Sequence, residues 1–346
     1  MRLFLTGGTG FIGQALVRAV RRRGWSLSVL VRDPASAPAR WIAAQGGELV
    51  PGDVTRADGL RQRLAGFDAV VHNAGVYELG AGAAERERMG RVNVEGTDAV
   101  LRAAHEAAVP RTVYVSAAWA LGPTAPTPSD ESHRHPGHFL TVYEESKVQA
   151  HQVALSWRER GLPLVTAMPN GVVGANDHSV FGYFLRLYLL GASPPMAFGG
   201  DAVLALVDVG ALAEGLCLVV ERGAMGQDYL FSGAPEPLRA TFARWRRYPG
   251  GTKAILWLPR WLMWPMMASL EPLERALRLP AFLSRDTVRA TRAHLSYDAG
   301  KARRELGWTH PAADEMWDRI VAEERALMGR RKGFIERLRH QAVVEG

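Results

Sequence analysis

A tyrosine and a lysine four residues apart are the first side chains in this sequence that could carry out proton chemistry. Tyr143-Glu-Glu-Ser-Lys147 opens a stretch of helical character that runs to about Arg160, so both side chains share one helix face. A neighbouring ammonium group favours a phenolate and lowers the pKa of the phenol. The pair could therefore give or take a proton at a carbonyl or carbinol oxygen. The alternative is an incidental pair on a helix surface.

Three glycines at three-residue spacing, Gly7, Gly10 and Gly13, form the second group. An apolar segment, Arg2 to Leu5, precedes them and predicts a buried strand, and Gln14 to Arg23 follows with helical periodicity. Glycines in such a turn allow a tight bend and a close approach of backbone to a pyrophosphate, and the helix N-terminus presents free N–H groups to it. The sequence therefore predicts a dinucleotide site. A nicotinamide bound there would carry the hydride that accompanies the proton transfer.

The elements that must position these groups alternate between strand-like and helix-like segments through the first two thirds of the chain. This order predicts an α/β fold, a Rossmann doubly wound parallel sheet with a smaller, mainly helical C-terminal lobe. The expected strands are 2–5, 26–31, 49–50, 68–72, 112–116, 164–168 and a late strand at 228–231. The expected parts are a dinucleotide-binding domain over 1–170 with the late strand 228–233 added, a substrate lobe over 171–330 interleaved with the sheet, and a basic tail over 331–346.

Composition limits the classes of protein further. The chain has 346 residues, 47% of them hydrophobic, and a net charge of +7. No basic stripe with interleaved aromatic residues is present, so we expect no nucleic-acid partner. No uninterrupted apolar run reaches membrane-spanning length, and a strand at residue 2 leaves no room for a signal peptide, so we expect a cytoplasmic protein. The single cysteine, Cys217, lies among apolar residues and predicts core packing.

With the glycine turn and the tyrosine–lysine pair in place, the sequence resembles the extended short-chain dehydrogenase/reductase family, also described as NAD-dependent epimerases and dehydratases. Within it, the chain is most similar to the dihydroflavonol-reductase-like and sugar-epimerase-like branch. The resemblance covers Met1 to about Gly233 and resumes at Ser296 to Trp308. It implies a homodimer formed through the Asn93 and Tyr143 helices.

The resemblance also implies site residues. The adenine end would be bound by Asp53 and Val54, Asn93 would support the active-site helix, and Pro169 to Val172 would close over the nicotinamide end. The implied cofactor-binding set is Thr6, Gly7, Gly10, Phe11, Ile12, Gly13, Arg32, Asp53, Val54, Asn73, Ala74, Gly75, Tyr143, Lys147, Pro169 and Val172. The implied catalytic set is Tyr143, Lys147 and Ser116. For Asp53 and Asn93, purely structural roles remain an alternative.

The third catalytic residue departs from the family pattern. Similar family members carry two adjacent hydroxyl residues at the end of the fifth strand, and the second holds the substrate oxygen. Counting back from Gly122 places Ala117 at that position and Ser116 at its neighbour. Adjacent side chains on a strand point to opposite faces, so the two positions are not equivalent. We favour a missing or rearranged hydroxyl over a Ser116 turned into the site.

The end of the second strand predicts the cofactor. An NAD-preferring site usually places an acidic residue there, about 20 residues beyond the glycines, to bond the ribose. Here Val31 occupies that position, Arg32 follows, and Asp33 before Pro34 is expected to begin a turn. A guanidinium group matches phosphate oxygens, which predicts NADP rather than NAD. The alternative is that Arg32 is a solvated charge at a strand end.

Several further features and functions stay open. The histidine-rich loop with His133, His135 and His138 favours a solvated loop over a metal site, because no acidic or cysteine partner has ligand spacing. The Trp and Met cluster over 257–267, interrupted by Pro259 and Pro265, favours lobe core or a lid over an apolar substrate more than an interfacial anchor beside Arg260.

The leading function is an NADP-dependent oxidoreductase that reduces a carbonyl of a small, partly apolar molecule. Nucleotide-sugar epimerisation or dehydration, and a catalytically quiet dinucleotide-binding protein, are the alternatives.

Overall fold

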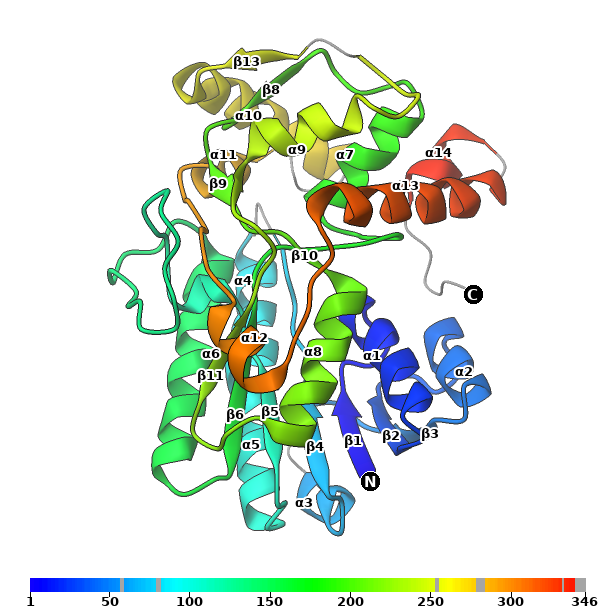
Figure 1. Ribbon diagram of the computed structural model, residues 1–346, viewed down its shortest axis with the longest axis vertical. Helices are drawn as coiled ribbons and strands as arrows, with labels where there is room; N and C mark the ends of the chain where they lie inside the picture. Colours follow the sequence, from blue (N-terminus) through cyan, green and yellow to red (C-terminus); the bar gives the residue numbers. More distant parts are fainter. Residues whose placement is uncertain (57–58, 79–81, 253–254, 278–283, 332, 340–346) are drawn as a thin grey trace.

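A parallel sheet of seven strands forms the centre of the molecule in the computed structural model, which describes residues 1–56, 59–78, 82–252, 255–277, 284–331 and 333–339 (Figure 1). Its strand order is β11-β6-β5-β4-β1-β2-β3. The strands are β1 (Arg2–Thr6), β2 (Ser26–Val31), β3 (Glu48–Pro51), β4 (Ala69–His72), β5 (Thr112–Val115), β6 (Leu164–Pro169) and β11 (Asp228–Phe231). The order reverses between β1 and β4, where ligands of doubly wound sheets bind. The predicted α/β Rossmann fold is confirmed.

Helices cover both faces of this sheet, because each strand is apolar on both sides. Leu3 and Leu5 of β1 pack against one group of helices and Phe4 against the other. The first group is α1 (Phe11–Arg22), α2 (Ala37–Ala44), α8 (Val209–Arg222) and α12 (Gly300–Leu306). The second group is α3 (Leu60–Leu64), α5 (Gly96–Glu106) and α6 (Val142–Glu159). Cys217 is fully buried in the first core, as predicted.

The structure adds local detail to the elements predicted from the sequence. The helix expected from Asn93 begins earlier, with α4 (Ala83–Met89) and a π-helical turn (Gly90–Glu95) that runs directly into α5. Asp208 caps α8 as predicted, since its carboxylate accepts a hydrogen bond from Ala211 N at 2.8 Å. A short 3₁₀ turn (Ala118–Ala120) follows β5.

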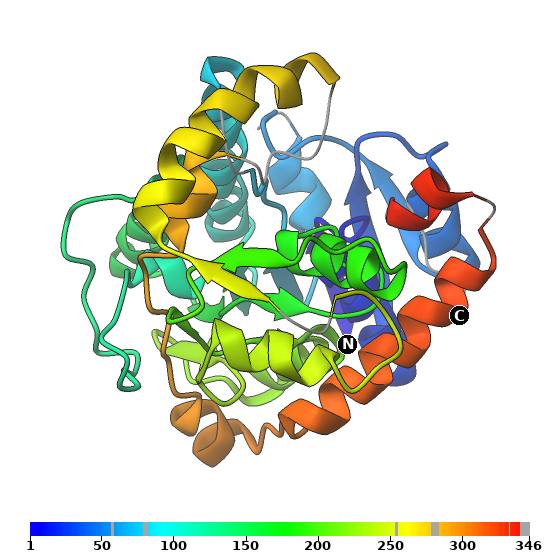
Figure 2. The same ribbon diagram turned by 90° about the horizontal axis from the view of Figure 1, so that it is seen from above.

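A second layer of short elements lies beyond the carboxyl ends of the strands, at the top of Figure 1 and in front in Figure 2. The helices of this lobe are α7 (Val180–Leu189), α9 (Leu238–Trp245), α10 (Arg260–Leu277), α11 (Arg285–Ala290), α13 (Ala313–Gly329) and α14 (Phe334–Leu338). Its strands form pairs: β7 (Val172–Val173) with β10 (Val207–Asp208), β9 (Val203–Leu204) with β12 (Glu236–Pro237), and β8 (Met196–Phe198) with β13 (Leu256–Leu258). The lobe, predicted as mainly helical, therefore also contains strands. Pro259 precedes α10, whereas Pro265 lies inside it.

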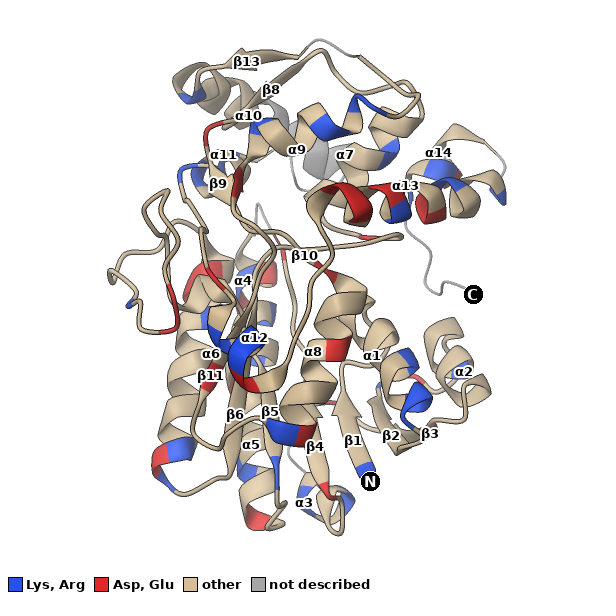
Figure 3. Cartoon of the chain, viewed as in Figure 1, with Lys and Arg blue, Asp and Glu red and all other residues tan. Residues whose placement is uncertain are grey.

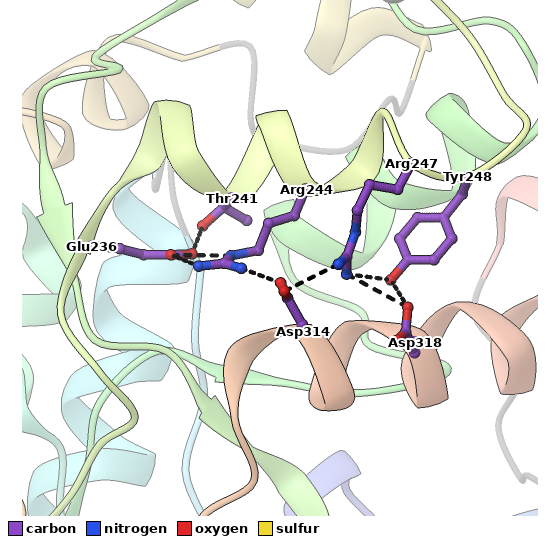
Figure 4. A network of polar contacts seen from close by, with 7 residues as sticks. All are labelled: Glu236, Thr241, Arg244, Arg247, Tyr248, Asp314 and Asp318. Atoms are coloured by element: carbon purple, nitrogen blue, oxygen red, sulfur yellow. Dashed lines mark hydrogen bonds and ion pairs between the residues drawn. The ribbon is translucent and has the colours of Figure 1, made fainter.

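A polar network holds α9 to α13 (Figure 4). Arg244 bonds both Glu236, at 2.8 Å, and Asp314, while Tyr248 donates to Asp318 at 2.6 Å. A single exposed ion pair contributes little to stability. In a network, each side chain that bonds two partners loses less side-chain entropy for each bond formed. The network therefore fixes the outer wall of the lobe rather than supplying most of its stability.

The basic tail is described only in part, because Lys332 and residues 340–346 lie outside the described residues. Arg186 of α7, which is buried, donates to Leu338 O at 2.8 Å, so α14 lies against the lobe. Within the described ranges, no helix combines the length and hydropathy needed to cross a bilayer.

Candidate functional site

The glycine turn between β1 and α1 leaves room that only glycine can provide. Gly7 has φ +73°, and a Cβ there would lie 2.7 Å from the backbone of Asn73 and Ala74. A Cβ on Gly13 would lie 2.1 Å from Gly7 O. Gly10 caps α1 without any side-chain hydrogen bond, and the first turn contains no acidic residue. The helix N-terminus is therefore open to an anion.

A single cavity of about 730 Å³ begins at this turn and extends into the lobe. It brings together most of the residues predicted to form the site. Those that line it are Gly7, Gly10, Phe11, Ile12, Arg32, Asp53, Val54, Asn73, Ala74, Gly75, Ser116, Tyr143, Lys147, Pro169 and Val172.

Thr6 and Gly13 differ from the other predicted cofactor residues, because neither lines the cavity. The hydroxyl of Thr6 bonds His72 Nδ1 at 2.8 Å and accepts from Ala74 N at 3.2 Å. Burial lowers the pKa of His72 to about 3, so this imidazole is neutral. Thr6 and Gly13 shape the turn from behind.

The N-terminus of α6 is held by a capping arrangement that fixes the direction of Tyr143. Thr141 Oγ1 accepts from Glu144 N at 3.1 Å, and the buried Glu144 carboxylate accepts from Leu140 N at 2.6 Å. His135 Nε2 lies 3.0 Å from the same carboxylate. The His135 of the predicted solvated loop thus anchors the active-site helix, and the described residues hold no group of His, Cys, Asp and Glu arranged for a metal ion.

Tyr143 and Lys147 both border the cavity, and burial shifts both pKa values towards the neutral forms. Burial lowers the pKa of Lys147 to about 8, and its ammonium lies 3.5 Å from Val115 O. Burial, with Tyr77 and Tyr114 nearby, raises the pKa of Tyr143 above its usual value. The expectation that Lys147 lowers the pKa of this phenol is therefore wrong, because burial disfavours the phenolate.

Asn93 joins three parts of the site. Its amide oxygen accepts from Val76 N at 2.7 Å, and its amide nitrogen donates to Val76 O and, at 3.0 Å, to Ser146 on α6. The residue is buried within the π-helical turn. It therefore connects the loop after β4 to the helix that carries Tyr143, which matches the supporting role expected from the sequence.

The end of β5 places Ser116 and Ala117 differently. Ser116 Oγ is shielded from solvent and has no hydrogen-bond partner of ordinary geometry among the described residues. Ala117 is extended, with φ −156° and ψ 153°, and its side chain borders the cavity beside Trp119. Both residues border the cavity, but the Ser116 hydroxyl has no exposed surface, so we expect position 117 to be the place where a hydroxyl could reach a bound substrate.

The end of the cavity beside β2 and β3 has one positive side chain, and two carboxylates at or near it are used in local hydrogen bonds. Arg32 is exposed at the end of β2 and borders the cavity. Asp33 accepts from Ala35 N at 2.9 Å, so it begins a turn as predicted. Asp53 accepts from both the amide and the hydroxyl of Thr55 at 2.9 Å. Of the described residues that line the cavity, the one that directly follows β2 is Arg32, and no Asp or Glu stands there.

The lobe end of the cavity is apolar. Arg32 and Lys147 are the only cationic residues other than histidine among the described lining residues. Aromatic, Met and Leu side chains from the lobe form the rest of this end: Phe181, Phe184, Tyr188, Met196, Phe198, Leu204, Leu206, Leu238, Phe242, Trp245, Met263, Met266, Met267 and Leu295. An apolar molecule fits this end, whereas a diphosphate finds no guanidinium or ammonium partner there.

Sequence reasoning missed several lining residues. The ring of Tyr77 packs edge-on against Tyr143, with centroids 4.7 Å apart. Asp177, after β7, accepts from Ser179 and Gly182, and burial raises its pKa to about 6. Both residues lie in loops that follow strands of the sheet, and a polar residue after a strand end was the available signal.

The comparisons with known proteins match this geometry. The model of the NAD dependent epimerase/dehydratase family matches residues 3–230. The chain belongs to this family. This confirms the resemblance to the extended short-chain dehydrogenases/reductases drawn from the sequence.

Individual members of the NAD dependent epimerase/dehydratase family extend the similarity over most of the chain. A putative dihydroflavonol 4-reductase of Synechocystis is 31% identical over 88% of this chain and 89% of its own. A farnesyl-dihydroquinoline-oxide ketoreductase of Stigmatella aurantiaca is 32% identical over 89% of this chain and 92% of its own. The dTDP-glucose 4,6-dehydratase of Streptomyces venezuelae shares the fold, with a TM-score of 0.75 at 24% identity, 95% of this chain and 98% of the other being covered. The chain is an NAD(P)-dependent oxidoreductase.

Proposed function

We propose that this protein reduces a carbonyl group of a small, partly apolar substrate with NADPH, and that Tyr143 donates the proton. One observation carries the proposal: a continuous cavity joins the glycine turn and the Tyr143–Lys147 pair to an apolar lobe wall. The glycine turn and the uncapped start of α1 fit a dinucleotide pyrophosphate. The proposal includes a cytoplasmic location, expected from the sequence, and a homodimer, which the family resemblance implies.

The reaction divides between cofactor and protein as follows. When bound, the nicotinamide supplies a hydride to the carbonyl carbon. Tyr143, kept neutral by burial, gives its proton to the carbonyl oxygen. The ammonium of Lys147 then stabilises the phenolate that remains. The C=O double bond becomes a C–O single bond as one C–H and one O–H bond form, and Tyr143 regains a proton from solvent.

The substrate class follows from the lobe wall and from the relatives. Burial of a substrate against the apolar end would stabilise binding by about 25 cal/mol for each Å² of apolar surface removed from water. The described residues that line this end include no Lys or Arg for a diphosphate. The ketoreductase relative is named for a farnesyl-bearing quinoline oxide, which is a ketone with a large apolar part. Both observations favour an apolar ketone over a nucleotide sugar.

Hydrogen exchange can test this substrate class directly. In the presence of NADP⁺, an apolar cyclic ketone is expected to slow exchange in residues 255–267 more than dTDP-glucose does, because Met263 and Met267 border the apolar end. Residues 96–106 of α5, away from the lobe, serve as the internal control. Equal or greater protection by the nucleotide sugar would place epimerisation or dehydration first.

Position 117 allows a gain-of-function test. We expect Ala117→Ser to raise turnover of a soluble diketone by roughly tenfold, because a hydroxyl there would hold the substrate oxygen, a bond of about 1.5 kcal/mol. Ser116→Ala is the matched control and is expected to change little, since Ser116 Oγ is enclosed. Loss of turnover in Ser116→Ala would instead identify Ser116 as the working hydroxyl.

The remaining alternative is a catalytically quiet dinucleotide-binding protein. Ala117 favours it, because the hydroxyl that family members use is absent at that position. NADPH oxidation with several apolar ketones separates the two proposals: binding of NADPH without any oxidation would support the quiet protein.

A further inference from the structure

The outer surface of the lobe carries an apolar face. We name it the α10 face and define it by Met196, Leu256, Trp261 and Leu262. Their exposed fractions are 41%, 63%, 75% and 42%. Leu256 pairs with Met196 in the parallel β13–β8 pair, and Trp261 and Leu262 follow within six residues of Leu256, at the start of α10. Clustered exposure of this kind marks a docking surface.

The same helix is a wall of the cavity. Met263, Met266 and Met267 on its inner side border the apolar end, whereas Trp261 and Leu262 do not. Met196 is both exposed and part of the lining. One helix thus separates the apolar cavity from the apolar outer surface, and the cavity reaches that surface at Met196.

The segment that forms this end of the lobe is strongly basic. Residues 238–292 contain eleven Lys and Arg against three Asp and Glu, a net charge of +8, whereas the whole chain carries +7. The rest of the chain is therefore close to neutral. Figure 3 shows arginines on α9, α10 and α11 at this end of the molecule. Part of this charge is paired, since Arg244 and Arg247 contact α13 and Arg260 contacts Asp201.

The arginines beside the α10 face belong to α11, which packs along α10. Arg285 and Arg289 lie on this helix, each over the ring of Trp264 of α10, and Arg289 also pairs with Asp286 at 3.1 Å. The helix α10 itself has no charged residue from 261 to 270. An apolar helix face bordered by arginines is the arrangement of helices that lie in the plane of a membrane surface.

We propose that the α10 face docks on the surface of an anionic lipid bilayer, with α10 lying in the interface and the cavity opening beside it. Like charge disfavours a second copy of this chain on the same face. A bilayer also holds the class of apolar ketone proposed above as substrate, although the docking itself is measured without substrate. A failure of docking and a failure of the proposed reaction are therefore separate results.

Vesicle flotation tests the proposal with the full chain. Wild-type protein is expected to float with phosphatidylcholine vesicles that contain about 30% phosphatidylglycerol, and only weakly with phosphatidylcholine alone. The double variant Trp261→Ser with Leu262→Ser is expected to lose at least about tenfold in binding, because both side chains leave the acyl boundary. Its turnover of a soluble ketone should be unchanged, since neither residue borders the cavity.

Phe139→Ser is the matched control, since Phe139 has the same exposed fraction as Leu262, 42%, in a loop away from the lobe. It is expected to float like the wild type. Wild-type protein that stays at the bottom of the gradient would overturn the proposal. So would a double variant that floats like the wild type, or a Phe139→Ser variant that loses as much binding. A dimer that only the double variant disrupts, without flotation, would assign the α10 face to a second copy.

Discussion

Tyr143→Phe is expected to lower turnover by about 10²–10⁴-fold while leaving NADPH affinity nearly unchanged. The change removes the proposed proton donor but keeps the ring that packs against Tyr77 at 4.7 Å, so α6 and the cavity wall are expected to keep their shape. Steady-state oxidation of NADPH with any accepted ketone gives the turnover. Fluorescence titration of NADPH gives the affinity separately.

Tyr77→Phe is the matched control for Tyr143→Phe. It removes a phenolic hydroxyl from the same cavity and from the same ring pair, but from a residue that is not the proposed donor. We expect less than about a tenfold change in turnover. Comparable activity in Tyr143→Phe and wild type would show that Tyr143 does not donate the proton, and a larger loss in Tyr77→Phe would transfer that role to Tyr77.

Arg32→Ala is expected to weaken NADPH binding by about 10- to 100-fold and to leave NADH binding nearly unchanged. Arg32 is exposed where β2 ends, at the adenosine end of the cavity. A charge-assisted bond from a guanidinium to a 2′-phosphate contributes about 1.5–3 kcal/mol, which NADH, without that phosphate, cannot gain. Calorimetric titration of both cofactors against both proteins measures the difference.

The control for Arg32→Ala is Arg40→Ala. Arg40 is also exposed, lies on the neighbouring α2, and does not border the cavity, so it tests whether loss of any nearby positive charge is sufficient. Its NADPH affinity is expected to stay within about threefold of the wild type, with a modest dependence on salt. Equal NADPH and NADH affinities in the wild type, or a parallel loss of both in Arg32→Ala, would contradict an NADP preference.

The features that depend on neighbours in sequence could be predicted. The strand, glycine turn and helix at the N-terminus follow from local conformational demands, since Gly7 needs positive φ and Gly13 has no room for a Cβ. The Asp33 turn and the Asp208 cap are likewise local hydrogen bonds within a few residues. The alternation of strands and helices determined the doubly wound sheet, because parallel neighbours require crossover helices.

Tertiary structure decided the features that depend on residues far apart in the chain. Burial raises the pKa of Tyr143, and the nearby Tyr77 and Tyr114 raise it further, which the spacing of Tyr143 and Lys147 does not reveal. Ser116 Oγ has no exposed surface in the folded chain, which its position at a strand end does not reveal.

The sequence by itself therefore determined the fold, the family and the dinucleotide turn of this protein. The sequence did not determine the role of the lobe's Trp and Met cluster over residues 257–267, for which core, lid and interfacial anchor all stayed possible. Only the folded chain turns Met263 and Met267 into the cavity and Trp261 outward. The physical reason is that the burial of a side chain depends on all of its neighbours in space. These neighbours include residues more than 50 positions away along the chain, such as Met196 and Phe198 of β8.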